Sequence, residues 1–207
     1  EINSSNDNPI IDEEEQAVLH GGHFYGGHIA FAMDSLKNSV ANIADLMDRQ
    51  MALLVDPKFN NGLTANISGA MGKDAPINHG FKAVQIAMSA WTAEALKLTM
   101  PASVFSRSTE CHNQDKVSMG TIAARDCLRI LTLTEQVAAG LSMAVVQAVE
   151  LRIRDHGDVE LGERLNMFMR DVRKISAAHT EDRRFDKELA QCQQAIQQGL
   201  WKICHDM

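Results

Sequence analysis

The feature that most constrains the fold is an uninterrupted helical stretch over residues 116–156. It contains no proline, and glycine occurs in it only at positions 120 and 140. Over residues 137–149 the apolar side chains would point in every direction around a helix, a pattern typical of helices that are buried on all sides. The stretch is also far longer than the average helix of about 11–12 residues. Because 207 residues are too few to surround such a helix completely, we expect a bundle of long helices that partner subunits complete.

Composition and periodicity extend this prediction to the whole chain, which we expect to be all-α. Aromatic residues make up only 5% of the sequence, and strands depend on aromatic and β-branched side chains. Apolar residues at three- and four-residue spacings predict a second long helix over 29–55. The residues at these spacings are Phe31, Leu36, Val40, Ile43, Leu46, Met47, Met51 and Leu54.

Shorter helices are expected over about 79–98, 160–178 and 184–204. The intervening stretches 57–78 and 101–114 are rich in Gly, Asn, Ser and Pro and predict irregular loops. Strands are expected only as short pieces near residues 18–25. Met88, Met119 and Met143 lie at helical spacing and are predicted to fill the core.

The charge pattern and hydropathy argue against nucleic-acid and membrane partners. The net charge is −7, and no basic run is present, so a nucleic-acid partner is not expected. We find no continuous apolar run of the roughly 20 residues that a helix needs to span a bilayer, so no membrane association is expected either. The four cysteines form no metal-type or disulfide-type pattern and are interpreted as free thiols of a cytoplasmic protein, with Cys127 in the core.

Three short segments, rich in Asn, Asp, Ser, Gly or His, differ in composition from the sequence expected for a helical core. They are EINSSNDNPIID at residues 1–12, HGGHFYGG at residues 20–27 and STECHNQDKVSMG at residues 108–120. In this order and at about this spacing they resemble the N-D-N-P, G-G-N-F and N-Q-D segments of the aromatic amino-acid ammonia-lyase superfamily. That family includes histidine, phenylalanine and tyrosine ammonia-lyases and related aminomutases, and the resemblance covers about residues 1–155.

The resemblance implies an all-α homotetramer whose active sites gather residues from several subunits. It also implies an electrophilic methylideneimidazolone (MIO) group, which forms when an Ala-Ser-Gly triad cyclises. The nearest string here is Ile67-Ser68-Gly69, which lacks the Ala, and the family's catalytic Tyr and carboxylate-binding Arg also lie upstream of the N-D-N-P segment. We therefore expect a C-terminal portion of such an enzyme, inactive without the N-terminal portion. Residues 1–155 would belong to the catalytic domain and residues 156–207 would form C-terminal helices of the same domain.

The resemblance also assigns roles to individual residues. Glu110 stands where the phenylalanine and tyrosine enzymes carry a Glu that faces the substrate amine, and Gln114 matches the Gln of N-Q-D. These two are the candidate catalytic residues, with Asn113 beside them. Phe24 matches the Phe of G-G-N-F, which packs near the substrate, and Asn8 matches the second Asn of N-D-N-P, placed to bond a carboxylate or the prosthetic group.

Two residues depart from the family pattern at this site. His23 replaces the usual Asn before Phe24, and Tyr25 follows where Gln or His is commoner; both are included as substrate-binding candidates. Histidine enzymes tend to carry Glu where Gln114 stands, so Gln114 together with Glu110 favours Tyr or Phe as the substrate. The motifs do not separate a lyase from an aminomutase.

Simpler interpretations stand beside these. Glu110 could be a solvated loop acid, Asn8 only a turn residue, Phe24 plain core, and Gln114 a neighbour of the helix cap, for which Asp115 is the better candidate. The chain could also be a non-catalytic subunit of a helical assembly. His20, His23 and His28 suggest a metal site, but their spacing matches no established ligand motif, so no metal is predicted.

Overall fold

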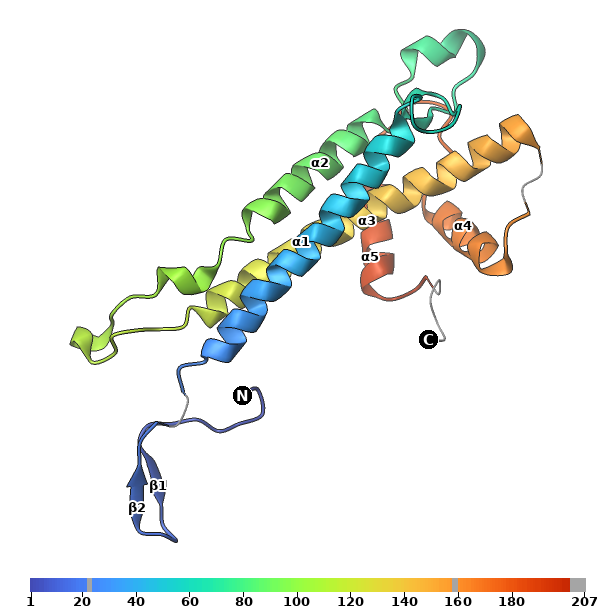
Figure 1. The fold of residues 1–207 in the computed structure, drawn as a ribbon. Helices are drawn as coiled ribbons and strands as arrows, with labels where there is room; N and C mark the ends of the chain where they lie inside the picture. The colour runs from blue at the N-terminus through green and yellow to red at the C-terminus, as the bar shows by residue number, and fades with distance from the viewer. Residues whose placement is uncertain (22–23, 158–159, 202–207) are drawn as a thin grey trace.

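The computed structural model describes residues 1–21, 24–157 and 160–201, and these form an all-α structure with one small hairpin (Figure 1). The helices are α1 (Gly27–Val55), α2 (Lys82–Lys97), α3 (Gly120–His156), α4 (Glu163–Ile175) and α5 (Asp186–Gln197). The first three run side by side along the length of the molecule and pack against one another, while α4 and α5 pack against α3 and against each other. The predicted fold class and helices are confirmed, with most ends shifted by at most four residues. Helix α5 ends at Gln197, and the predicted end near residue 204 lies outside the described residues.

The start of α3 differs from the prediction. Its cap is Met119, which has a φ of 58° and no side-chain capping bond, and the Gly120 N–H donates to Ser118 Oγ at 3.3 Å. Asp115 lies four residues before this point, so its assignment as the helix cap was wrong. The residues between Gln114 and Met119 instead belong to the preceding loop.

The core lies where α1, α2 and α3 meet. Met88 and Met143 are fully buried there, as predicted, and so is Cys127, whereas Met119 is half-buried. Gly140 allows α2 to approach α3 closely, because a Cβ at that position would lie 2.7 Å from Met88 Sδ. Cys111 is exposed and Cys192 buried, and no disulfide forms among these three thiols; Cys204 lies outside the described residues.

The inward face of α1 includes only part of the apolar series that predicted the helix, with Val40 and Met51 buried and Met47 and Leu54 packed against the core. Phe31, Ile43 and Leu46 are 74%, 53% and 59% exposed. The buried stripe of α1 consists mostly of small and charged residues, namely Ala30, Asp34, Lys37, Val40, Ala41, Ala44, Asp48 and Met51. The helix prediction was right, but Phe31, Leu36, Ile43 and Leu46 face away from the rest of the chain.

Helix α3 is buried only in part. By length and composition it could cross a membrane, so the expectation that no apolar stretch reaches that length was wrong. Within its most apolar window 56% is buried inside the chain, which is the position of a core helix in a bundle. Leu128 and Val145 remain 65% and 39% exposed. The complete burial expected for this helix is therefore not achieved by the described residues alone.

A short antiparallel hairpin precedes the bundle. Strand β1 (Ile10–Asp12) pairs with β2 (Ala17–Leu19), with Ile11 opposite Val18. Asp12 Oδ1 accepts hydrogen bonds at 3.1 Å from the N–H groups of Glu14 and Glu15, which shapes the connecting turn. The hairpin therefore forms earlier in the sequence than predicted, and it projects beyond the end of the bundle at which α1 begins (Figure 1).

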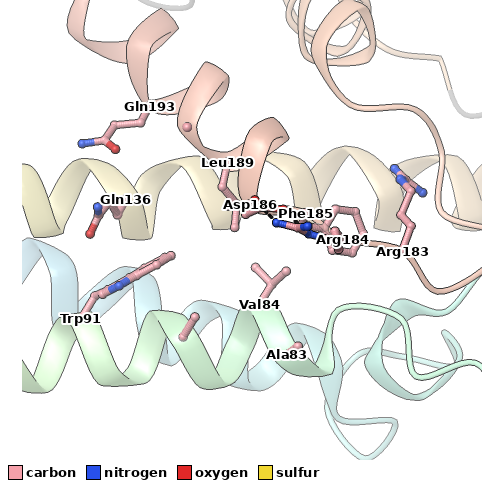
Figure 2. Close-up of a pocket in the computed structure, with 12 residues that line it drawn as sticks. Ala83, Val84, Trp91, Gln136, Arg183, Arg184, Phe185, Asp186, Leu189 and Gln193 are labelled. Carbon is pink, nitrogen blue, oxygen red and sulfur yellow. Dashed lines mark hydrogen bonds and ion pairs between the residues drawn. The ribbon is translucent and has the colours of Figure 1, made fainter.

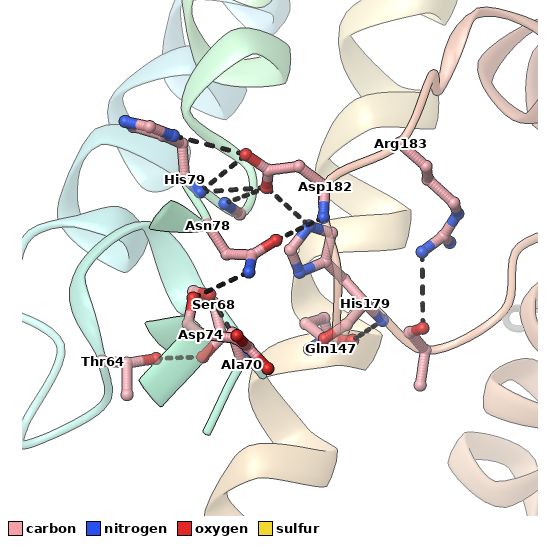
Figure 3. A network of polar contacts seen from close by, with 12 residues as sticks. Thr64, Ser68, Ala70, Asp74, Asn78, His79, Gln147, His179, Asp182 and Arg183 are labelled. Carbon is pink, nitrogen blue, oxygen red and sulfur yellow. Dashed lines mark hydrogen bonds and ion pairs between the residues drawn. The ribbon is translucent and has the colours of Figure 1, made fainter. Parts of the chain in front are cut away.

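The loops at the other end of the bundle are tied together by buried polar groups (Figure 3). Gln147 of α3 donates through Nε2 to the His179 carbonyl and accepts from the His179 N–H, each at 3.0 Å. His179 Nε2 lies 3.1 Å from Asp182 Oδ1. The Asp182 carboxylate also accepts from the N–H groups of His79, at 2.8 Å, and Gly80, at 3.0 Å. Segments about 100 residues apart in the sequence are joined in this way.

This network predicts a pH-dependent contribution to stability. Burial alone would raise the pKa of Asp182, but the hydrogen bonds from His79, Gly80 and His179 outweigh it and lower that pKa. A carboxylate whose pKa is lowered on folding stabilises the fold at pH values above its ordinary pKa of about 4. This stabilisation is lost as the pH falls below that value toward the lowered pKa. We expect Asp182→Asn to lower Tm at pH 7 by about 2–4 °C, the effect of roughly 1 kcal/mol for a partly exposed carboxylate. The difference from wild type should shrink as thermal melts are repeated from pH 4 downward, and a constant difference would contradict this assignment.

Candidate active site

The three segments singled out in the sequence lie at the end of the bundle where α1 and α3 begin and α2 ends (Figure 1). They approach each other at Gly26, where a Cβ would lie 3.6 Å from Ser118 Oγ. Glu1 Oε2 and His28 Nδ1 are 3.2 Å apart, so the first segment is tied to the start of α1. A cavity of about 350 Å³ lies between Glu1, Tyr25, Gly26, Gly27 and His28.

The first group of predicted site residues surrounds the hairpin. Asn8 Oδ1 accepts a hydrogen bond from the Gly21 N–H at 3.2 Å, which fixes the amide and joins the two sides of the hairpin at its base. Phe24 and Tyr25 are 50% and 40% exposed. The alternative that Phe24 is plain core is therefore wrong for this chain. His23 lies outside the described residues.

The second group lies on one compact loop. Thr109 and Gln114 pair through their backbones, with N···O distances of 2.8 and 3.3 Å, and the Thr109 hydroxyl donates to Gln114 Oε1 at 3.2 Å. Within this closed turn, Asn113 Nδ2 donates to Glu110 Oε2 at 3.4 Å. Glu110 and Asn113 are exposed and Gln114 is half-buried. The loop thus brings together three of the predicted residues.

The backbone of this loop is strained. Glu110, Cys111 and His112 have φ values of 52°, 53° and 67°, so three consecutive residues other than glycine occupy the left-handed region. Each costs on the order of 1–3 kcal/mol, and such residues are typical of active sites and ligand-binding loops. Ser108 Oγ lies 2.7 Å from His112 Nδ1 and helps to hold the turn.

The two groups share one end of the molecule without closing into one site. No hydrogen bond or ion pair joins Asn8, Phe24 or Tyr25 to Glu110 or Gln114 within residues 1–21, 24–157 and 160–201. Any remaining wall of a pocket must come from outside these residues.

A buried ionic cluster behind the loop was not predicted. Lys37 Nζ lies 2.9 Å from Asp34 Oδ1 and 3.7 Å from Asp126 Oδ2, and the Lys37 side chain is fully buried. Burial alone would raise the pKa of Asp34, but the bonds from Lys37 and from the Ala102 and Ser103 N–H groups lower it to about 2. A sequence signal did exist, because Asp34 and Lys37 are three residues apart on the same helical face as Ala30 and Ala41.

Two other features lie apart from this loop. No set of three His, Cys, Asp or Glu side chains is arranged to hold a metal ion in the described part of the chain, which includes His20 and His28 but not His23. A cavity of about 570 Å³ lies between α2, α3 and α5, with Trp91, Gln136 and Phe185 among its lining residues (Figure 2). None of the predicted site residues lines it.

Comparison with known proteins identifies the relatives of the chain. The family model for aromatic amino acid lyases matches residues 1–174. The histidine ammonia-lyase of Staphylococcus saprophyticus is 36% identical over 199 residues, which are 95% of this chain and 38% of that protein. The histidine ammonia-lyase of Staphylococcus aureus is 34% identical over 209 residues, which are 99% of this chain and 40% of that protein.

Solved structures of the same group superpose on the chain. Tyrosine aminomutase from Streptomyces globisporus gives a TM-score of 0.87 at 29% identity, over 97% of this chain and 36% of that one. Histidine ammonia-lyase from Trypanosoma cruzi gives a TM-score of 0.85 at 26% identity, over 95% of this chain and 37% of that one. The chain thus spans well under half the length of the relatives that it matches.

Proposed function

The chain belongs to the aromatic amino acid lyase family, and we propose that it supplies the C-terminal part of an enzyme that eliminates ammonia from an aromatic L-amino acid to give an aryl acrylate. The observation that carries this proposal is the strained loop at residues 108–114, which holds Glu110, Asn113 and Gln114 on one turn at the open end of the bundle. The complete enzyme would include a portion corresponding to the part of the relatives that this sequence does not span. By itself the chain would be inactive.

Glu110 would act on the substrate amine. Elimination of ammonia requires a group that holds the ammonium and takes its proton, and a carboxylate does both. Because Asn113 Nδ2 donates to Glu110 Oε2, the Oε1 atom is left to accept a hydrogen bond from the amine. The left-handed backbone at Glu110 fixes the direction in which its side chain leaves the loop.

The amides of this chain suit an MIO group in their chemistry. Asn8 and Gln114 each use the side-chain oxygen as an acceptor within the chain. Among the described residues this leaves their NH₂ groups as donors, which a carbonyl-bearing heterocycle could accept. When bound, the group supplies the electrophile that the side chains of proteins lack. We propose that its Ala-Ser-Gly precursor lies in the portion of the enzyme that this sequence does not cover.

The surface of α1 supports assembly with other chains. Phe31, Ile43 and Leu46 leave an apolar stripe exposed along the helix, and large exposed apolar patches commonly mark protein–protein interfaces. We propose that the N-terminal portion and further copies of the enzyme cover this stripe in a homotetramer. A cytoplasmic location remains our proposal from the sequence.

The proposed substrate is Tyr or Phe in preference to His, because Gln114 and Glu110 occur together. The staphylococcal histidine ammonia-lyases are similar enough to make L-His the necessary comparison. We expect the complete assembly to show a higher kcat/KM for L-Tyr or L-Phe than for L-His, measured from the absorbance of the arylacrylate product. Gln114→Glu should shift the ratio toward L-His by about tenfold or more, since a carboxylate binds an imidazole N–H better than an amide does. A wild-type assembly that prefers L-His would contradict this substrate proposal.

A second candidate function is aromatic amino-acid 2,3-aminomutase activity. The similarity to tyrosine aminomutase favours it, since that enzyme superposes over 97% of the chain. Product analysis distinguishes the two, because a mutase returns the amine to the β-carbon while a lyase releases ammonia. A β-amino acid as the main product would establish the mutase.

A further inference from the structure

We propose that Asp34 and Lys37 are positioning residues that anchor the loop carrying Glu110, residues 106–117, to α1. This inference rests on the proposed function, since it concerns the placement of the residue that would act on the amine. It assigns a role in the reaction to a buried ionic cluster at the base of the loop that carries Glu110.

The two side chains bind three backbone groups at the entrance to the loop. Lys37 Nζ donates to the Met100 carbonyl at 2.7 Å. The Asp34 carboxylate accepts from the Ala102 N–H at 2.9 Å and from the Ser103 N–H at 3.2 Å. Residue 101 between them is a proline without an N–H. Successive backbone groups of one short segment are therefore taken up by two side chains one turn apart on α1.

The loop continues directly from this anchor. The helical turn η3 (Ala102–Phe105) begins at it, and the Val117 N–H donates to Ser106 Oγ at 3.0 Å just beyond, which closes residues 106–117 into a loop. Glu110 lies inside this loop, on the turn η4 (Glu110–His112), and is exposed. Its placement relative to α1 thus depends on the base of the loop.

The third member of the cluster ties in α3. Asp126 Oδ2 lies 3.7 Å from Lys37 Nζ, so one ammonium group joins α1, the entrance of the loop and the first turns of α3. These are the elements whose ends carry the candidate residues. The lowered pKa of Asp34, about 2, keeps its carboxylate charged at any working pH.

Because Asp34 and Lys37 are buried, loss of one of the two charges should cost more than loss of both. Lys37 has no exposed side-chain area and Asp34 has 8%, whereas Asp126 has 32%, so water has little access to the Asp34–Lys37 pair. Removal of one partner from a buried pair leaves an uncompensated charge, whereas removal of both is far better tolerated. Loss of Lys37 alone would leave Asp34 facing Asp126 and would displace the segment that both charges hold.

The test compares variants of the complete assembly. Lys37→Met should lower kcat by about 100-fold with KM within about threefold, because a displacement of about 1 Å in a reacting group has an effect of this size. Asp34→Asn/Lys37→Met removes both charges and keeps an acceptor for the Ala102 N–H, so it should recover at least tenfold of the lost kcat. If Lys37→Met does not fold, Asp34→Asn alone should still lower kcat about tenfold.

The matched control is Gln147→Ala, which breaks buried hydrogen bonds at the opposite end of the bundle. It should lower Tm while kcat stays within about twofold of wild type. An unchanged kcat in Lys37→Met, or an equal loss of kcat in Gln147→Ala at the same loss of Tm, would overturn the proposal.

Hydrogen exchange separates this inference from the proposed function. Amide exchange in the segment 102–117 should be at least tenfold faster in Lys37→Met than in wild type, with exchange in α2 unchanged. An inactive wild-type assembly would refute the proposed function and leave this measurement valid. Unchanged exchange in the loop would refute the positioning role, whatever the activity.

Discussion

Replacement of Glu110 by Gln in the complete assembly is expected to lower kcat by about 10²–10⁴-fold, the usual contribution of a positioned acid or base. Gln keeps the size and the hydrogen-bonding oxygen of Glu but cannot take a proton or balance the charge of the substrate ammonium. The strained turn at residues 110–112 should persist, so KM should change much less than kcat. Steady-state kinetics with the preferred amino acid would measure both values.

Glu181→Gln provides the matched control, because Glu181 is also an exposed loop carboxylate but belongs to the loops at the other end of the bundle. It should leave kcat and KM unchanged. Full activity in Glu110→Gln would instead support the simpler interpretations, in which Glu110 is a solvated loop acid or the chain is a non-catalytic part of a helical assembly.

Gly69→Ala should have the largest effect on stability. A Cβ at this position would lie 2.1 Å from the His179 carbonyl oxygen and 3.0 Å from Gln147 Nε2. The oxygen belongs to the backbone and accepts the hydrogen bond from Gln147, so it cannot move without breaking the network shown in Figure 3. We expect a loss of about 3 kcal/mol, the upper end of typical overpacking costs, which lowers Tm by roughly 6–12 °C.

Gly162→Ala is the control for this substitution. Nothing lies within 4 Å of a Cβ at Gly162, and its φ of −60° suits any residue. It should therefore lower Tm by far less than Gly69→Ala in thermal melts under the same conditions. Equal Tm values for the two variants would show that the 69 and 179 segments do not pack as closely as described.

The helices were predictable from sequence, because they are marked by periodic apolar residues and most of their ends lie close to Pro, Gly or Asn. The inward face of α1 was not. Val40 and Met51 lie in its buried stripe, whereas Phe31, Ile43 and Leu46 lie on the exposed side. Periodicity indicates an apolar stripe but does not show which part of it this chain covers. From sequence, charged residues such as Asp34 and Lys37 are predicted to be exposed, because the backbone groups that pair with them in the interior are not visible there.

The candidate site was predictable only as separate segments. The motifs gave Asn8, Phe24, Glu110 and Gln114 in order along the chain, and the structure places them at one end of the bundle. The left-handed turn at Glu110, Cys111 and His112 had little signal, since only His112 is a residue type enriched at positive φ. The start of α3 was missed because Ser118 and Met119, rather than Asp115, form its first contacts.

We propose that this chain completes the active site of a self-modified aromatic amino acid lyase. The direct test is to purify the native assembly, denature it and measure the intact mass of each polypeptide. The polypeptide that carries the Ala-Ser-Gly triad, whether joined to this chain or separate, should weigh less than its sequence requires by the two waters lost in cyclisation. An unmodified mass in an assembly that still deaminates aromatic amino acids, or deamination by this chain alone, would contradict the account.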